Sequence, residues 1–301
     1  MSIKRTRQVP SPPHSLTPVV PERFAPVLAE LSDVSALFRA AGKRLYLVGG
    51  TVRDLLGGYA SDQIDFDATT NARPDETKRL LSGWADAVWT QGEKFGTIGA
   101  RKGERVYEIT THRAEAYHPD TRKPDVEYAD EIEIDLSRRD FTINALYANP
   151  QTGEVFDYFG GLTDLENGCL RFIGDAAQRI AEDFLRILRY FRFLARFGSG
   201  PVDADAINAC AQGAHGLTAL SRERIAQELA RLLSLKNPAA SVGLMIDNGI
   251  FTPFLPELCS DAHDRLQRLV EREQSVNQPL SLPARFLSIL VTDPVAVDKV
   301  A

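Results

Sequence analysis

The sequence changes character near residue 170. Between residues 44 and 160, short β-like runs such as "RLYLVGG", "QIDFDAT" and "RVYEITTH" are separated by turns, with two short helical segments among them. After about residue 170 these runs stop, and the segments have apolar residues at helical spacing, Ser or Asp at their starts and Gly, Pro or Asn at their breaks. We therefore expect an α/β head built on a sheet, followed by an all-α remainder.

This change divides the chain into four predicted parts. The first 20 residues are basic, rich in Pro and Ser and free of acids, which favours a disordered tail over a transit peptide. We assign residues 1–23 to this tail and residues 24–160 to the head. We expect residues 161–258 to form a helical neck and residues 259–301 to form a helical body.

Composition limits the classes of function. The net charge of −6 argues against a protein that coats nucleic acid through overall basicity, although a local basic channel remains open. The three cysteines form no C-x-x-C pair, so neither a zinc site nor a disulfide framework is indicated, and a cytoplasmic location fits best. No run approaches the roughly 18 apolar residues of a membrane span.

A glycine turn in "RLYLVGGTVRD" is the first candidate for chemistry. An apolar strand runs into Gly49 and Gly50 and then into a helix, for which Thr51 and Asp54 predict a capping box. Backbone N–H groups can approach a triphosphate closely where there is no Cβ, and the helix dipole favours the negative charge. The guanidinium of Arg53 would add positively charged N–H donors for a phosphate. The alternative is a tight turn without a ligand.

A pair of acids follows in "QIDFDATT". On a strand, Asp65 and Asp67 share one face, while Ile64, Phe66 and Ala68 point into a core. Two carboxylates held close together repel unless a cation lies between them, so the pattern suits Mg²⁺. Such metals activate an attacking hydroxyl and neutralise a leaving pyrophosphate. The alternative is a solvated strand face.

A second charged motif is "DLSRRDFTINALY", residues 135–147. Arg138 and Arg139 could contact a triphosphate, while Asp140 and Asn144 could hold the backbone and a ribose through hydrogen bonds. A salt-bridged turn would explain the charges, but not the buried "FTINAL" that follows at once.

The segment "EDFLRILRYFRFLARFG", residues 182–198, predicts a helix with two unlike sides. At 100° per residue the apolar side chains lie on one side, and Arg186, Arg189 and Arg192 lie on the other. A solvated face would give this separation. However, the arginine side also carries Leu185 and Phe193, so we expect another surface to cover it.

An Asp three residues before an Arg offers a base edge both acceptors and donors. Asp183 and Arg186 would lie on adjacent turns, where they could satisfy the Watson–Crick edge of cytosine or adenine after small side-chain movements. The pair could therefore select a nucleotide without a template base.

Together these strings resemble the motifs of the class II tRNA nucleotidyltransferase/poly(A) polymerase family. The matching segments are "LVGGTVRD…DQIDFDATTNARPDE", "RRDFTINA", "EDFLRILRYFRF" and "LSRERI", with "EITTHRAEAYHPDTRKPDVEY" resembling a flexible loop that carries Arg113, Asp120 and Arg122. The resemblance implies a mixed nucleotidyltransferase sheet of the polymerase beta-like superfamily, followed by an all-α neck and body. A structural cap is the favoured role for Arg222 and Arg224.

The resemblance also implies roles for individual residues. Asp65 and Asp67 would be the catalytic metal ligands, with Mg²⁺ as cofactor. The implied nucleotide-binding residues are Gly50, Arg53, Arg139, Asp183, Arg186, Arg189 and Arg192. Family members usually carry a further helical tail, so we expect that this chain is a fragment or has a minimal tail.

The implied activity is template-independent addition of CCA to a tRNA 3′ end from CTP and ATP. No obligate protein partner is expected. Close alternatives are a poly(A) polymerase or a member that adds only CC or A. A different class would be a non-catalytic RNA-binding module, which should have lost one of the two carboxylates. A phosphohydrolase suggested by His263-Asp264 would need further His and Asp ligands, and no such set is visible.

Overall fold

The computed structural model describes residues 24–59, 66–118, 121–258, 261–276 and 279–290, and for residues 114–126 it describes the backbone alone. The chain divides into two compact units, Met1–Glu166 and Asn167–Ala301, here called the head unit and the helical unit. This division agrees with the change of character near residue 170. The predicted finer division into tail, head, neck and body remains a prediction, and the 1–23 tail lies outside the described residues.

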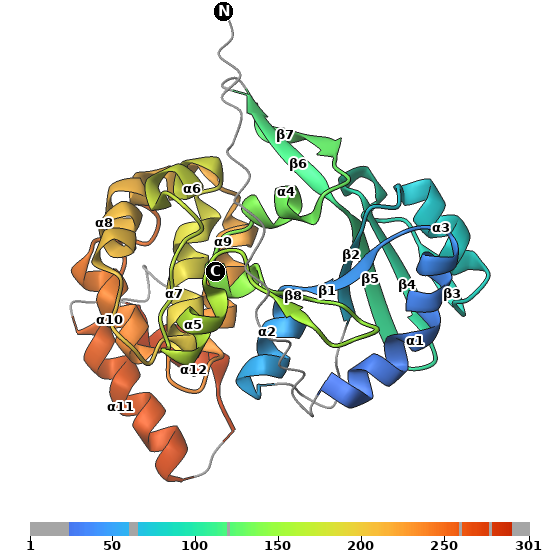
Figure 1. The fold of residues 1–301 in the computed structure, drawn as a ribbon. Coiled ribbons are helices and arrows are strands. Elements are labelled where there is room, and N and C mark those ends of the chain that lie inside the picture. The colour runs from blue at the N-terminus through green and yellow to red at the C-terminus, as the bar shows by residue number, and fades with distance from the viewer. Residues whose placement is uncertain (1–23, 60–65, 119–120, 259–260, 277–278, 291–301) are drawn as a thin grey trace, which may run out of the picture. The chain divides into compact units, whose positions relative to one another are not determined.

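The head unit is built on a seven-stranded mixed sheet with the strand order β3-β4-β5-β2-β1-β8-β9 (Figure 1). Strands β2 and β5 are parallel, and the other neighbouring pairs are antiparallel. The strands are β1 Leu45–Val48, β2 Phe66–Thr70, β3 Ala87–Trp89, β4 Thr97–Lys102, β5 Arg105–Thr111, β8 Tyr147–Ala148 and β9 Val155–Phe156. The predicted mixed sheet is thus confirmed.

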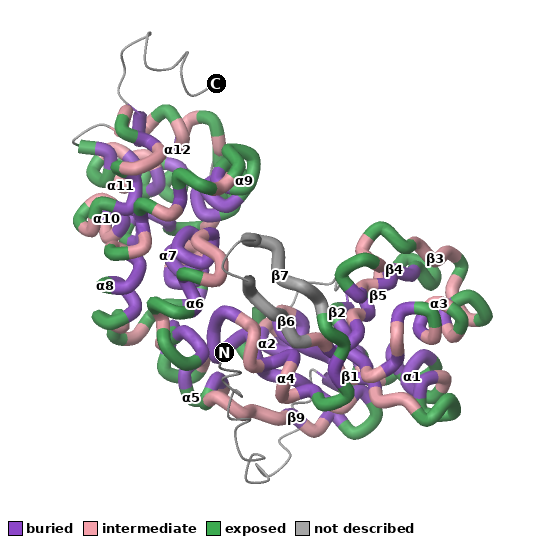
Figure 2. The backbone as a smooth tube through the Cα atoms, turned by 90° about the horizontal axis from the view of Figure 1, so that it is seen from above, coloured by how far each residue is buried: buried purple, intermediate pink, exposed green. Residues whose placement is uncertain are grey.

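Helices of the head unit share one hydrophobic core with this sheet. The α1 helix, Ala25–Ala40, and the α3 helix, Pro74–Ser82, contribute buried side chains to the same cluster as β1, β2 and β5. In Figure 2 the buried colour follows the central strands and one side of α1. The remaining helices are α2 Gly50–Gly57, α4 Ile132–Ser137 and α5 Gly161–Glu166, with short 3₁₀ turns at η2 Glu93–Phe95 and η3 Thr142–Asn144.

A two-stranded ribbon lies outside the main sheet. It consists of β6, Arg113–His118, paired antiparallel with β7, Thr121–Tyr128. These residues belong to the segment that resembles a flexible loop, and here the backbone of that segment forms a hairpin. Of its three predicted polar residues, Arg113 donates to the Phe95 carbonyl. Asp120 and the Arg122 side chain lie outside the described residues.

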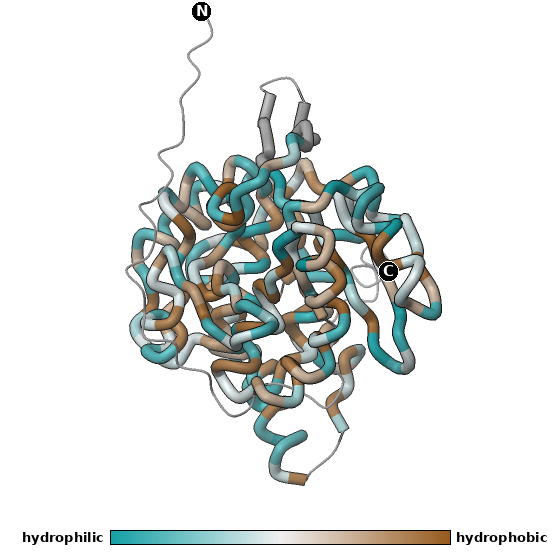
Figure 3. Tube along the Cα trace, turned by 45° about the vertical axis from the view of Figure 1, so that its right-hand side comes forward, coloured by the Kyte–Doolittle hydropathy of each residue, from teal (hydrophilic) through white to brown (hydrophobic). Residues whose placement is uncertain are grey.

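The helical unit is all-α where it is described. Its helices are α6 Ala176–Glu182, α7 Leu185–Phe197, α8 Ala204–Gly213, α9 Arg222–Leu233, α10 Ala239–Asp247, α11 Ala262–Ser275 and α12 Leu282–Ile289, with the 3₁₀ turn η4 Ala214–Ala219. The α7 helix packs against α9 and α10. Along both units hydrophobic and hydrophilic residues alternate (Figure 3), as expected for elements with one face in a core.

The segment expected to form one helix over residues 182–198 is broken at its start. Asp183 has an extended backbone (φ −152°, ψ 107°) that ends α6, and α7 begins at Leu185. The Asp183 carboxylate accepts a hydrogen bond from the Leu185 N–H at 3.1 Å, which satisfies a donor of the new helix. The extended backbone at Asp183 therefore divides the predicted helix into α6 and α7. Within the described residues, none of the helices combines the length and hydropathy that a membrane crossing requires.

Candidate active site

The glycine turn after β1 lies against the side chain of Arg139. Gly49 has φ +62°, and its N–H donates to the Leu146 carbonyl at 3.0 Å. A Cβ on Gly49 would lie only 2.8 Å from Nη1 of Arg139. Only glycine allows both this backbone angle and this close approach. The turn and Arg139, 90 residues apart in the sequence, therefore form one cationic spot.

The predicted capping box at this turn is wrong. The N-cap of α2 is Gly49, which has no side chain, and the helix begins at Gly50. The Thr51 hydroxyl instead accepts a hydrogen bond from the Asp67 N–H at 3.3 Å. Because this bond joins α2 to β2, Thr51 fixes the position of the predicted catalytic strand relative to the turn.

Asp67 lies on the open face of β2 next to this turn. It is exposed, whereas Phe66 and Ala68 on either side are buried, as the alternating pattern predicts. A Cβ on Gly50 would lie 4.0 Å from Oδ2 of Asp67 and 3.6 Å from Nη2 of Arg53. An exposed carboxylate next to a glycine turn is a hard oxygen donor suited to a divalent cation.

The other half of the predicted metal pair cannot be placed in the same way. Asp65 and Ile64 lie outside the described residues. Among the residues that are described, no group of three or more His, Cys, Asp or Glu side chains could hold a metal ion. The metal pair therefore remains a prediction, supported at Asp67 by exposure and donor chemistry.

Arg53 lies in a buried network rather than pointing freely from the turn. Its Nε and Nη2 bind Oδ1 of Asp54 at 2.8 and 2.7 Å, and its Nη1 donates to Oδ1 of Asn144. The Asn144 amide donates in turn to Oδ1 of Asp140 at 2.9 Å, which also accepts from the Phe141 N–H. Asp140 therefore holds the backbone, as expected, and this chain of bonds ties α2 to the "RRDFTINAL" segment.

Asp135, which the sequence analysis did not single out, holds both arginines of that segment. Its Oδ1 accepts from Nε and Nη2 of Arg138 at 2.9 and 2.6 Å, and its Oδ2 accepts from Nη2 of Arg139 at 3.1 Å. Burial pushes the pKa of this fully buried carboxyl upward, but the charges of the two arginines outweigh burial and hold the pKa at about 2. The spacing of three and four residues was the sequence signal available for this contact.

In the helical unit, the first two predicted selectivity residues have different ionic partners. The Asp183 carboxylate accepts from Nη2 of Arg224 at 2.9 Å. Nη1 of Arg186 donates to Oε2 of Glu182 at 2.7 Å and to the Arg179 carbonyl at 2.8 Å. Arg186 is buried, while the Asp183 side chain keeps 34% of its surface exposed. The ion pairs of the two side chains that the structure describes thus go to different residues.

The later arginines of α7 lie against an aromatic ring and a buried acid. The Arg189 and Arg192 guanidinium carbons lie 5.4 and 4.4 Å from the centre of the Phe193 ring. Nε of Arg192 donates to Oε2 of Glu228 on α9 at 2.6 Å. Burial lowers the pKa of Arg192, and Glu228 opposes that shift.

The arginine side of α7 is covered, as predicted from its apolar residues. Leu185 and Phe193 are both buried, and α9 packs along the helix. At the start of α9 the Ser221 hydroxyl accepts from the Arg224 N–H at 3.4 Å and caps the helix, whereas the Arg224 side chain pairs with Asp183. The solvated-face alternative therefore does not describe this side of α7.

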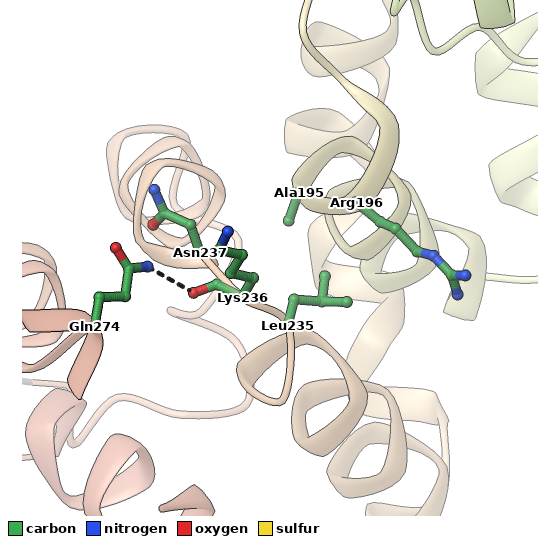
Figure 4. Close-up of a pocket in the computed structure, with 6 residues that line it drawn as sticks. All are labelled: Ala195, Arg196, Leu235, Lys236, Asn237 and Gln274. Carbon is green, nitrogen blue, oxygen red and sulfur yellow. Dashed lines mark hydrogen bonds between the residues drawn. The ribbon is translucent and has the colours of Figure 1, made fainter. Parts of the chain in front are cut away.

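A basic hollow of about 490 Å³ lies near the C-terminal end of α7 (Figure 4). It is lined by Ala195, Arg196, Leu235, Lys236, Asn237 and Gln274. The Gln274 amide donates to the Lys236 carbonyl at 3.3 Å, which ties α11 to the turn after α9. Two cations and two amides without an acid in the lining form a surface suited to phosphate groups.

Comparison with known proteins places the chain in a family. Residues 45–171 match the poly A polymerase head domain, and residues 201–261 match the family described as "probable RNA and SrmB-binding site of polymerase A". The chain belongs to the tRNA nucleotidyltransferase/poly(A) polymerase family. Both matched segments follow the order that the resemblance predicted.

Several members of the tRNA nucleotidyltransferase/poly(A) polymerase family resemble the chain over most of its length. The mitochondrial CCA tRNA nucleotidyltransferase 1 of Mus musculus is 40% identical over 86% of this chain and 59% of its own length. A CCA-adding enzyme of Ligilactobacillus salivarius is 36% identical over 84% of this chain and 59% of its own length. The chain thus spans less than two thirds of the length of these relatives.

A solved structure in the tRNA nucleotidyltransferase/poly(A) polymerase family has the same fold. The Bacillus stearothermophilus CCA-adding enzyme in complex with CTP aligns with a TM-score of 0.69 at 28% identity. The alignment covers 83% of this chain and 57% of that protein. The α/β head followed by helices is therefore the family fold.

Proposed function

We propose that the protein adds CCA to the 3′ end of tRNA from CTP and ATP without a nucleic-acid template. The observation that carries this proposal is the approach of Arg139 to Gly49 and of Asp67 to Gly50, a guanidinium and a carboxylate beside the N-terminus of α2. The likeness to CCA-adding enzymes supports the choice of substrates.

The head unit would supply the chemistry. The RNA 3′-hydroxyl oxygen attacks the α-phosphorus of the nucleotide and loses its proton, a new P–O bond forms, and pyrophosphate leaves with the electrons of the broken bond. Gly50 and Arg139 would hold the phosphates, and Arg53 would support the turn. Asp65 and Asp67 would hold a divalent cation, for which we propose Mg²⁺, whose charge stabilises the attacking and leaving oxygens.

The helical unit would select the nucleotide. The exposed part of the Asp183 carboxylate supplies acceptors, and Arg186 supplies donors for a cytosine or adenine edge. Arg189 and Arg192 would hold the nucleotide. The basic hollow around Lys236 would contact the RNA backbone. A cytoplasmic location belongs to the proposal, because the thiols of Cys169 and Cys210 fit a reducing compartment.

The direct test uses Mg²⁺ and a tRNA that ends at its discriminator base. We expect cytidine addition with CTP alone and complete C-C-A addition only when CTP and ATP are both present. Long adenosine tracts from ATP alone would instead establish poly(A) polymerase activity. Addition of only CC or only A under all conditions would establish a partial enzyme. Absence of any transfer, with RNA binding retained, would favour the non-catalytic RNA-binding module.

A further inference from the structure

We propose that Glu228 is a positioning residue for nucleotide binding, which acts by holding the guanidinium of Arg192. The inference rests on the proposed function, since that function assigns Arg192 to the nucleotide. Glu228 itself lies on α9, outside the residues that the proposed function assigns to the nucleotide, and it lies 36 positions from Arg192 in the sequence.

Glu228 is a buried acid that links two helices. Its side chain is 3% exposed, yet both of its carboxylate oxygens are used. Oε2 accepts from Nε of Arg192 on α7 at 2.6 Å, and Oε1 accepts from Nη1 of Arg231 on α9 at 2.9 Å. The Arg192 side chain is 13% exposed, whereas that of Arg231 is 61% exposed. The contact to Arg192 is therefore the desolvated one, where a charge-assisted hydrogen bond is strongest.

This contact fixes how the Arg192 guanidinium is turned. The hydrogen bond uses Nε, and the Phe193 ring covers the guanidinium with its centre 4.4 Å from Cζ. Within the part of the chain that the structure describes, Nη1 and Nη2 of Arg192 have no hydrogen-bond acceptor. Two N–H-bearing nitrogens held in one orientation are the edge that binds phosphate oxygens in bidentate geometry.

The charges of the cluster also favour an anionic ligand. Two guanidinium groups share one carboxylate, so the cluster of Arg192, Glu228 and Arg231 carries a net positive charge. Glu228 offsets enough charge to let Arg192 be buried without neutralising the site. A glutamine at this position would present N–H donors to guanidinium N–H donors and would release one of the two arginines.

The test compares four variants with the wild-type chain: Glu228→Gln, Arg231→Gln, Arg192→Gln and the double variant Arg192→Gln/Glu228→Gln. We expect Glu228→Gln to raise the KM for CTP and its dissociation constant without RNA by about tenfold, the effect of losing one charge-assisted hydrogen bond. We expect kcat to change by less than about twofold, because this contact would bind the nucleotide equally well in the ground state and in the transition state. Arg231→Gln removes the exposed partner and one solvent-screened charge of the cluster, and should raise both constants by less than about twofold.

The double variant separates positioning from a structural role. If Glu228 acts through Arg192, then Glu228→Gln adds nothing to the effect of Arg192→Gln on CTP binding. Equal effects of Arg231→Gln and Glu228→Gln, additive effects in the double variant, or a lower melting temperature with unchanged CTP binding would each overturn the proposal. A wild-type chain that binds no CTP would instead refute the proposed function, which the same titration detects.

Discussion

At the scale of single residues, an acid with little exposed side-chain surface binds two arginines at three places in the described part of the chain. Asp135, Glu182 and Glu228 each bind two guanidinium groups. Their partners are Arg138 and Arg139, Arg179 and Arg186, and Arg192 and Arg231. Removing one such acid destabilises the fold, because its arginines are left without a compensating charge. These acids therefore hold in place arginine side chains that would otherwise be mobile.

The first prediction concerns Asp135 and pH. Its folded pKa of about 2 lies below the ordinary value of 3.8, so its ionised form stabilises the folded chain at neutral pH. We expect Asp135→Asn to lower the free energy of unfolding by about 2 kcal/mol near pH 7. The contribution is complete above the unfolded pKa and is lost as pH falls toward 2, so the difference from wild type should narrow between about pH 4 and 2.

Denaturant unfolding at a series of pH values measures this difference. Asp75→Asn is the matched control, because the Asp75 side chain is 89% exposed and its ion pair with Lys78, at 3.1 Å, lies on the protein surface. The control should match wild type within about 0.5 kcal/mol at every pH. A difference between Asp135→Asn and wild type that stays constant down to pH 2 would contradict the assigned pKa.

The second prediction concerns the carboxylates of the proposed metal site. We expect Asp65→Ala and Asp67→Asn each to reduce nucleotide transfer by roughly 100-fold or more, because charge stabilisation in the transition state is lost. CTP binding should persist in part, since Arg139 and the glycine turn remain. Single-turnover assays measure the loss of transfer, and equilibrium CTP titration measures the binding that remains. Asp75→Asn is again the control. Normal transfer by Asp67→Asn would remove this residue from the catalytic site.

At the scale of elements, the turn between β1 and α2 depends on one backbone angle. Gly49 has φ +62° and ψ −122°, and Arg139 lies where a side chain would be. The third prediction is that Gly49→Ala lowers the free energy of unfolding by about 1–3 kcal/mol. It should also weaken CTP binding, because the new methyl group displaces the Arg139 guanidinium.

Gly83→Ala is the control for this substitution. Gly83 ends α3 with φ −88°, and a Cβ there would meet nothing within 4 Å. Its stability should therefore be equal to or slightly above that of wild type. Thermal unfolding of both variants measures the cost of the backbone strain. CTP titration of both variants measures the effect of displacing Arg139. Unchanged CTP affinity in a folded Gly49→Ala protein would show that the turn does not set the position of Arg139.

At the scale of the whole molecule, an acidic chain presents a local basic surface. The net charge is −6, yet the hollow near the end of α7 is lined by Arg196 and Lys236 and by no acid. The fourth prediction is that Lys236→Glu weakens tRNA binding and makes the slope of log affinity against log salt concentration shallower by about 1. CTP affinity should stay the same, because the hollow is not part of the proposed nucleotide site.

Filter binding of labelled tRNA at several salt concentrations measures this slope. Arg268→Glu makes the same change of charge at an exposed position of α11 outside the hollow. It should leave the slope near the wild-type value. Equal losses of affinity for both variants would point to a general charge effect and would remove the hollow from the RNA surface.

The sequence by itself determined the two kinds of architecture and the exposed position of Asp67. Alternation around Asp67 is a local pattern, so burial of Phe66 followed from it. Burial of Phe193 followed from its apolar character on the arginine side of α7. Asp135 was also within reach of such analysis, because it lies three and four residues from its arginines. The predicted capping box is wrong because α2 begins at Gly50, so Thr51 lies inside the helix and not at its N-cap. The predicted single helix is broken because the backbone of Asp183 is extended.

Only the tertiary structure decided which groups meet across the chain. It brought Arg139 over Gly49 and Glu228 onto Arg192, contacts between residues 90 and 36 positions apart. It also gave Asp183 and Arg186 different ion-pair partners, Arg224 and Glu182. The physical reason is that periodicity reports only which face a side chain occupies, whereas packing of one element on another decides what that face contacts.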